Sequence, residues 1–144
     1  MTTEGEQTGW ILNAFKYDDG TGKIFRVREK PSEELSEDKL STCVILEWPL
    51  DSDMPSKDIM EHIKNMENAL SPLDTENGDS VLFHIITGGG MREWCYYTTS
   101  YDWFINELSS FLEGLPRYPI NIEYQEGTDW SYWRSIQEVA NDPS

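Results

Sequence analysis

Three consecutive glycines at positions 88–90 separate two stretches that are rich in β-branched and aromatic residues. This is the strongest β-hairpin signal in the sequence, because glycine adopts the backbone angles of a tight turn without steric cost. The pattern predicts a central hairpin with strands at residues 80–87 and 92–98. The other elements can be placed as strands beside this hairpin or as helices packed on it.

Further strands and helices follow from the spacing of apolar residues along the rest of the chain. Alternating or short apolar runs predict strands at residues 10–17, 23–28, 42–48 and 118–124. Apolar residues at helical spacing, together with residues that typically start or stop helices, predict helices at residues 55–70, 101–113 and 129–140. The expected capping residues are Asp53 or Ser56, Thr99 or Ser100, and Thr128.

From residue 42 onward the expected order is β-α-β-β-α-β, followed by a helix. This is the split βαβ order of a ferredoxin-like fold, with strands in the spatial order 118–124, 42–48, 92–98, 80–87 and two helices on one face. The N-terminal hairpin would extend one edge of this sheet or cover its other face. We therefore expect one α+β domain at residues 9–140, ferredoxin-like with an added N-terminal β-hairpin and a short C-terminal helix, between flexible tails at 1–8 and 141–144.

Alternation along the central hairpin divides its side chains between the two faces of the sheet. If all three glycines form the loop, His84 lies opposite Trp94. One face would then carry Leu82, His84, Ile86, Arg92, Trp94 and Tyr96, and the other would carry Val81, Phe83, Ile85, Cys95 and Tyr97. Both faces are largely apolar, so the face without the two helices needs a cover. The N-terminal hairpin and the Trp-rich C-terminal helix can supply it, and a partner protein is the alternative.

The charge of the chain limits the partners that it can bind. Its 144 residues include 27 acidic and 11 basic side chains, which gives a formal net charge of −16. Such a chain repels phosphate backbones, so we expect no direct binding of nucleic acid. A basic protein is a possible partner. A charge that only keeps the protein soluble is the simpler alternative.

Two cysteines, Cys43 and Cys95, lie in apolar strand-like segments and form no CxxC pair. We expect buried free thiols in a reducing compartment. The first nine residues are polar and acidic, unlike a signal peptide, and no apolar run approaches the ~20 residues of a membrane helix. The expectation is a cytoplasmic protein without membrane contact, as a monomer or weak dimer.

Few residues are suited to catalysis or metal binding. The two histidines, His62 and His84, are not spaced with the cysteines as a zinc site, so we expect no metal and no cofactor. His84 is interpreted as a core histidine or an aromatic stacking partner. The predicted alternation places Cys95 away from it, which argues against a Cys–His pair. No catalytic residue is assigned, and the protein is interpreted as a non-enzyme.

The glycine turn has an alternative interpretation as a ligand site. Gly88, Gly89 and Gly90 would allow close approach of a ligand to the backbone, with Arg92 beside them as an anion contact. The turn lacks the Gly-Lys-Ser/Thr of a phosphate loop, so a purely structural turn is the simpler interpretation. Arg92 needs a partner of its own, either the face of an aromatic ring or a carboxylate such as Glu47, Glu123 or Asp129. The candidate ligand or partner-binding residues are His84, Gly88, Gly89, Gly90, Arg92, Trp94, Tyr96, Trp130 and Trp133.

An ordered set of short motifs runs through the second half of the chain. They are Thr87-Gly88, Arg92-Glu93-Trp94-x-Tyr96-Tyr97, Tyr118-Pro119, and Asp129-Trp130 with Tyr132 and Trp133. Together with the N-terminal strands, these motifs resemble the bacterial family called domain of unknown function 695. The resemblance covers nearly the whole chain and departs from the family at residues 125–130, where the usual Glu-Asp-Pro-x-Trp lacks its proline.

That family is in turn similar to the ferredoxin-like regulators that inhibit ribonuclease E, which are small, acidic and non-catalytic. The resemblance implies a binding or regulatory module that docks on a basic partner protein, for example as an inhibitor of a nuclease. The alternative is a small-ligand-binding protein or enzyme that uses the glycine turn with Arg92 and His84.

Overall fold

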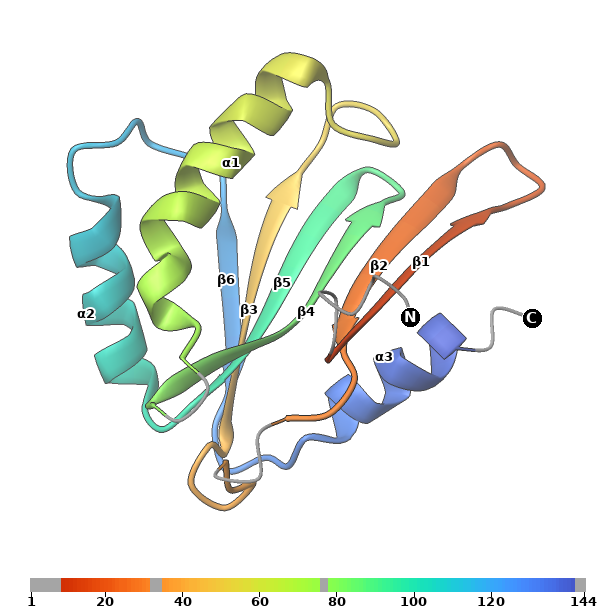
Figure 1. Cartoon of the computed structure of the whole chain (residues 1–144). Helices are drawn as coiled ribbons and strands as arrows, with labels where there is room; N and C mark the ends of the chain where they lie inside the picture. Colours follow the sequence, from red (N-terminus) through yellow and green to blue (C-terminus); the bar gives the residue numbers. More distant parts are fainter. Residues whose placement is uncertain (1–8, 32–34, 76–77, 142–144) are drawn as a thin grey trace.

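The computed structural model describes residues 9–31, 35–75 and 78–141 (Figure 1). It shows an α+β fold with one six-stranded antiparallel sheet and three α-helices. The strands are β1 (Trp10–Lys16), β2 (Gly22–Arg28), β3 (Thr42–Pro49), β4 (Ser80–Gly88), β5 (Met91–Thr98) and β6 (Asn121–Gln125). The helices are α1 (Lys57–Leu70), α2 (Tyr101–Leu112) and α3 (Ser131–Asn141), and a short 3₁₀ turn, η2 (Ser71–Leu73), follows α1.

The strands lie side by side in the order β1-β2-β4-β5-β3-β6. The predicted order of the four strands from residue 42 onward is therefore confirmed. Two places were predicted for the N-terminal hairpin, and the structure shows it extending the edge of the sheet, because β2 pairs with β4 and β1 pairs with β2. The predicted tails at 1–8 and 142–144 lie outside the described residues, and residue 141 ends α3.

Helices α1 and α2 cover one face of the sheet (Figure 1), which we call the two-helix side. The hydroxyl oxygen of Ser56 accepts a hydrogen bond from the backbone N–H of Ile59, and that of Ser100 accepts one from Trp103. These caps satisfy donors that a helix start leaves unpaired. The buried stripe of α1 then packs on the sheet through Ile63, Met66 and Leu70. One predicted cap was wrong: α3 begins at Ser131, whose N–H bonds the Asp129 carboxylate rather than Thr128.

Helix α3 packs on the opposite face, which we call the α3 side, over β1, β2 and β4. Trp130 and Trp133 are both 6% exposed and pack around Phe83. Each indole N–H has a buried acceptor: Trp130 donates to the carbonyl of Leu40, and Trp133 to that of Arg28. The C-terminal helix is thus the predicted cover. None of the helices in the described ranges is long and apolar enough to cross a membrane.

The central hairpin has a shorter loop than predicted. Gly88 pairs with Met91, so only Gly89 and Gly90 remain in the turn. A β-bulge between Leu82 and His84 adds a second shift. The shorter loop shifts the pairing of residues 84–88 by one relative to the prediction, and the bulge restores the predicted pairing at residues 80–82. Because side chains alternate with a period of two, only the segment between the bulge and the loop changes faces.

The predicted division of side chains between the two faces was therefore wrong for His84, Ile85 and Ile86, while the other hairpin residues share faces as predicted. His84 pairs with Cys95 and lies on the α3 side, where its ring contacts Tyr132 of α3. Arg92 and Trp94 lie on the two-helix side, where both bond Glu67 of α1. Ile85 and Ile86 also exchange sides relative to the prediction. His84 consequently does not share a face with Arg92, and it does share one with Cys95.

Candidate functional site

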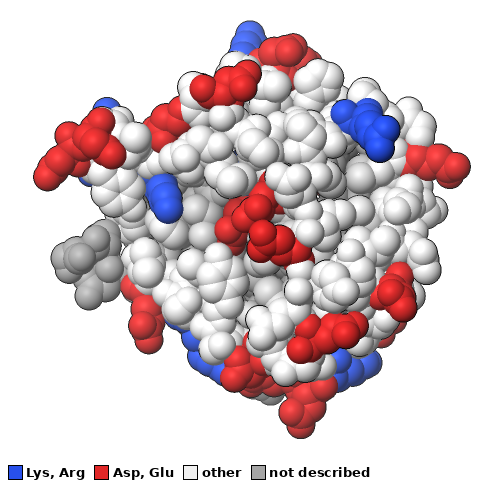
Figure 2. All heavy atoms as spheres, turned by 180° about the vertical axis from the view of Figure 1, so that it is seen from behind, with Lys and Arg blue, Asp and Glu red and all other residues white. Residues whose placement is uncertain are grey.

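A pocket of about 290 Å³ opens on the α3 side of the sheet, over β3, β5 and β6. Three of its lining residues are carboxylates, one from each strand: Glu47, Glu93 and Glu123. Sheet register brings them together, since Glu47 and Glu93 are directly paired and Glu123 pairs with Ile45, two residues before Glu47. In the view from behind, acidic side chains gather at the centre of the molecule (Figure 2).

Tyrosines form much of the remaining wall of this acidic pocket. Tyr132 of α3 is 37% exposed, and Tyr97 lines the pocket from β5. Tyr124 of β6 adjoins the pocket, but its ring lies on the two-helix side, where it stacks on Tyr101 of α2 with centroids 3.6 Å apart. No Lys or Arg occurs among the lining residues in the described ranges. The three carboxylates therefore lack a basic neighbour within the pocket wall, and Tyr97 and Tyr132 lie beside them.

The carboxylates differ in how they are held. Glu47 has a raised pKa because of burial and because Glu123 and Glu93 repel its charge. Burial also opposes ionisation of Glu93, but hydrogen bonds from His84 and Tyr132 outweigh it and lower the pKa of Glu93. Glu93 is thus a fixed anion, whereas Glu47 carries a charge that its surroundings disfavour.

His84 positions Glu93 from beneath the pocket. Its side chain is fully buried, and Nε2 lies 2.8 Å from Oε2 of Glu93. The hydroxyl of Tyr132 donates to the same oxygen at 2.6 Å, and the two rings meet edge-on with centroids 5.2 Å apart. This geometry fits the interpretation of His84 as a core histidine, although no local pattern in the sequence indicates Glu93 as its partner.

A family model matches most of the chain. The family described as "Family of unknown function (DUF695)" matches residues 12–136. The chain belongs to this family. The match begins within β1 and ends within α3, so all six strands and three helices lie wholly or partly inside it. A search of the curated proteins returns no match.

Arg92, Trp94 and Tyr96 lie on the two-helix side in this member of the DUF695 family. Arg92 donates from Nε at 3.2 Å and from Nη2 at 2.6 Å to Oε2 of Glu67, and Trp94 Nε1 donates to the same atom at 2.8 Å. The predicted partners Glu47, Glu123 and Asp129 were wrong, because they belong to the opposite side of the sheet or to the segment that leads into α3. The position of Glu67, four residues after Ile63 of the buried stripe, is the sequence signal that was missed.

The glycine turn is occupied by a carboxylate of the chain itself. Asp53 accepts a hydrogen bond from the N–H of Gly89 at 2.6 Å, and its other oxygen accepts from Gly22 at 3.0 Å. The N–H of Gly90 donates to the backbone carbonyl of Asp53. These are the donors that a bound anion would use. Asp53 therefore stands where the anion would bind, and it ties the turn to the segment before α1.

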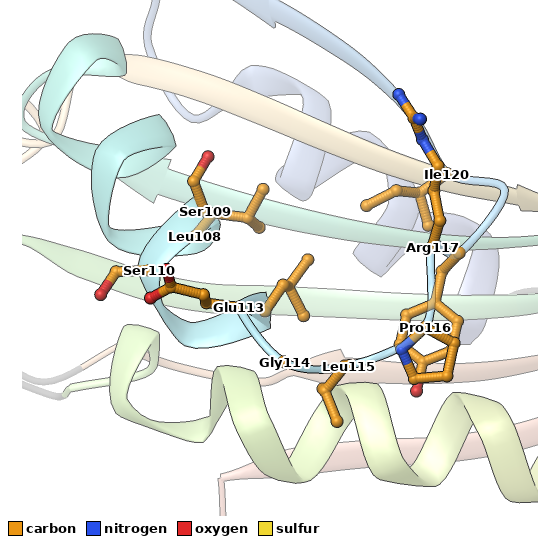
Figure 3. A pocket seen from close by; sticks show the side chains of 11 residues that line it. Leu108, Ser109, Ser110, Glu113, Gly114, Leu115, Pro116, Arg117 and Ile120 are labelled. Carbon is orange, nitrogen blue, oxygen red and sulfur yellow. The ribbon is translucent and has the colours of Figure 1, made fainter.

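A larger hollow of about 640 Å³ lies between the end of α2 and the segment that leads into β6 (Figure 3). Its wall is mostly apolar, with Leu108 and Ile120 on opposite sides. Glu113 and Arg117, the charged residues in its wall, point away from each other in Figure 3. The hollow offers no converging polar groups. Among the described residues there is also no group of three His, Cys, Asp or Glu side chains suited to a metal ion.

The raised pKa of Glu47 implies that its charge lowers the stability of the folded protein at neutral pH. When folding raises the pKa of a carboxyl group, the protein is most stable at pH values below the pKa of that group in the unfolded chain. This stability is lost as the pH rises through the pKa of the group in the folded protein. We expect Glu47→Gln to stabilise the protein at pH 7 by up to about 1 kcal/mol, the range for partly exposed charge pairs. The gain should shrink towards pH 4. Urea unfolding of both proteins at the two pH values measures it, and an equal difference at both would contradict the mutual repulsion.

Proposed function

We propose that this protein is a non-enzymatic binding module whose acidic pocket receives a basic side chain of a partner protein. The observation that carries the proposal is the convergence of Glu47, Glu93 and Glu123 on one pocket whose described wall holds no basic residue. Carboxylates with aromatic walls are complementary to a lysine ammonium or an arginine guanidinium. The pocket volume, about 290 Å³, suits an inserted side chain rather than a large cofactor.

The charge of the protein supports the proposal both at long range and within the pocket. The net charge of −16 attracts a basic surface from afar and raises the rate of encounter. Within the pocket, a cation would relieve the repulsion that raises the pKa of Glu47. Tyr132 is partly exposed at the rim and can pack on the aliphatic stem of the inserted side chain. Interfaces are commonly anchored by such tyrosines.

Inhibition of a nuclease is the most specific form of this proposal. Nucleases hold their substrates with Lys and Arg, so an acidic protein that covers these residues would compete with nucleic acid. The β-α-β-β-α-β order and the strand order β6-β3-β5-β4 support a ferredoxin-like assignment and, with it, the likeness to inhibitors of ribonuclease E. The two buried free thiols fit a reducing cytoplasm as the place of action.

The test begins with capture of a partner from a bacterial lysate on the immobilised protein, with elution in steps of rising salt. The purified partner is then titrated against two variants of equal net charge. Glu47→Gln/Glu123→Gln removes two charges from the pocket, and Glu61→Gln/Glu113→Gln removes two exposed charges from α1 and α2. We expect the pocket variant to bind at least tenfold more weakly and the control within about threefold.

Recovery of no protein partner, or an equal loss of affinity in both variants, would overturn the proposal. The second outcome would show that only the overall charge matters. The nuclease form of the proposal has a separate test. Labelled RNA is mixed with the captured partner in the presence of each variant, and cleavage of the RNA is followed by its fluorescence.

A ligand site or enzyme at the glycine turn receives less support. His84 and Arg92 lie on opposite sides of the sheet, so they do not converge on a common substrate. The N–H groups of the turn already bond Asp53.

A further inference from the structure

The sheet has two open edges, β1 and β6, at opposite ends of the strand order (Figure 1). Strand β6 pairs with β3 on one side, and no strand from the described residues lies on its other side. The side chains of β6 are exposed except for that of Ile122, which is half-buried. An open edge of this kind is a template for a further strand.

The hydrogen-bond register shows which backbone groups of β6 are free. Leu50, directly after β3, donates to the carbonyl of Gly90, so the even-numbered residues of β3 bond β5 and the odd-numbered ones bond β6. The N–H and C=O groups of Ile122 and Tyr124 therefore point away from β3. In the part of the chain that the structure describes, these groups have no hydrogen-bond partner. They are available to an incoming strand.

The side chains of β6 differ between the two faces of the sheet. On the α3 side, Glu123 lines the acidic pocket beside Glu47. On the two-helix side, Tyr124 stacks on Tyr101 and remains 51% exposed. An added strand would place alternate side chains beside a carboxylate and beside an aromatic ring. The edge therefore favours a strand in which basic and apolar residues alternate.

The acidic pocket lies within reach of such a strand. Neighbouring strands are about 4.8 Å apart, so Glu123 is one strand away and Glu47 is two strands away. The long stem of an arginine can lie across β6 and carry its guanidinium to both carboxylates. Within the described ranges, no Lys or Arg of the pocket wall competes for them.

We propose that the partner protein adds an antiparallel strand to β6, with basic side chains on the α3 side and apolar side chains on the two-helix side. The inference rests on the proposed function for the charge of the partner and on the open edge for its extended conformation. Main-chain hydrogen bonds to Ile122 and Tyr124 hold the strand, and alternate side chains give specificity. A second copy of this chain fits less well, because Glu123 of each copy would approach the other.

The test uses the synthetic peptide acetyl-VRVRVRV-amide. In an antiparallel pair, the residues that bond Ile122 and Tyr124 have their side chains on the same face as these two, so they are the valines. Methylation of the backbone nitrogens of the two central valines removes donors to β6. Methylation of two arginine nitrogens, which point away from β6, is the matched control. We expect a Kd of roughly 0.1–1 mM for the unmodified peptide and at least tenfold weaker binding after valine methylation than after arginine methylation.

Strand β1 provides an internal control, since it is an open edge without an acidic side chain. Tyr17 donates to the carbonyl of Thr21, so the odd-numbered residues of β1 bond β2. The N–H groups of Leu12 and Ala14 therefore face the open edge, as those of Ile122 and Tyr124 do in β6.

Hydrogen exchange of these four amides locates the peptide. With saturating peptide, exchange at Ile122 and Tyr124 should slow at least tenfold, and exchange at Leu12 and Ala14 should not change. Equal slowing at both edges, no saturable binding, or equal binding of the two methylated peptides would overturn the added strand. Protection of β6 that rises with protein concentration in the absence of peptide would also overturn it, in favour of a second copy.

The pocket variant Glu47→Gln/Glu123→Gln separates this inference from the proposed function. If the variant binds the peptide at least fivefold more weakly but valine methylation has no effect, the acidic pocket is supported and the added strand is wrong. If the variant binds the peptide as the unaltered protein does, the proposed function is contradicted, and so are the basic side chains of the added strand.

Discussion

Trp133→Ala is expected to lower the free energy of unfolding by about 4 kcal/mol, at the upper end of the range for buried aromatic residues. Trp133 is 6% exposed and sits at the centre of the α3 side, with its ring edge-on to Phe83 at 5.3 Å. The substitution creates a cavity that the sheet cannot fill by relaxation. It also removes the indole N–H that donates to the carbonyl of Arg28 at 2.7 Å.

Two further variants separate packing from hydrogen bonding. Trp133→Phe keeps most of the ring volume but loses the donor, so we expect a smaller loss of about 1–3 kcal/mol. Val139→Ala changes a residue of the same helix that is 44% exposed, and it should cost less than about 0.5 kcal/mol. Urea unfolding followed by circular dichroism measures all three. A loss below 1 kcal/mol for Trp133→Ala would mean that α3 does not close this side of the sheet.

Gly88→Ala is expected to destabilise the protein by at least about 3 kcal/mol, because a backbone clash adds to a strained φ angle. Gly88 has φ +138°, which side chains rarely adopt. A Cβ atom there would lie 2.1 Å from the carbonyl oxygen of Gly22 and 2.8 Å from Cα of Lys23. Both are backbone atoms of the neighbouring β2, so no side chain can move to make room. The first residues of β2 would have to separate from β4.

Gly89→Ala is the matched control in the same turn. Gly89 has φ +67°, and the nearest atom to its Cβ position is the flexible Cε of Lys23 at 3.7 Å. We expect a loss of only about 1–2 kcal/mol, the cost of a left-handed backbone for alanine. Hydrogen exchange locates the damage: amide protection in β2 should fall in Gly88→Ala and persist in Gly89→Ala. Similar stability of the two variants would contradict the close approach of β2 and β4 at this glycine.

Much of the fold could be predicted because local signals agree with the tertiary structure. The strands alternate clearly, Ser56 and Ser100 cap the starts of α1 and α2, and Pro116 follows α2. With these elements in order, the path of the chain leaves few arrangements of the central four strands. The late start of β6 at Asn121 is a local exception, since Pro119 lacks an N–H and Ile120 donates to the carbonyl of Tyr118.

The candidate sites were harder to predict because they depend on register. The bulge before His84 moves this residue to the α3 side, and no residue type between 81 and 84 signals it. Glu47, Glu93 and Glu123 are unremarkable in the sequence. They form a pocket only once three strands are aligned side by side. Local periodicity carries no information on such convergence.

The joining of β1 and β2 to α3 has a consequence for how the chain folds during synthesis. Asn13 donates to the carbonyl of Ala140 across 127 positions, and Trp133 reaches Arg28 across 105. At translation rates of about 5–20 residues per second, β2 precedes α3 by roughly 6–20 seconds. During this interval Phe25 and Val27 lack the helix that buries them. Strands β1 and β2 are therefore synthesised long before the helix that encloses them, and chaperones have time to bind them.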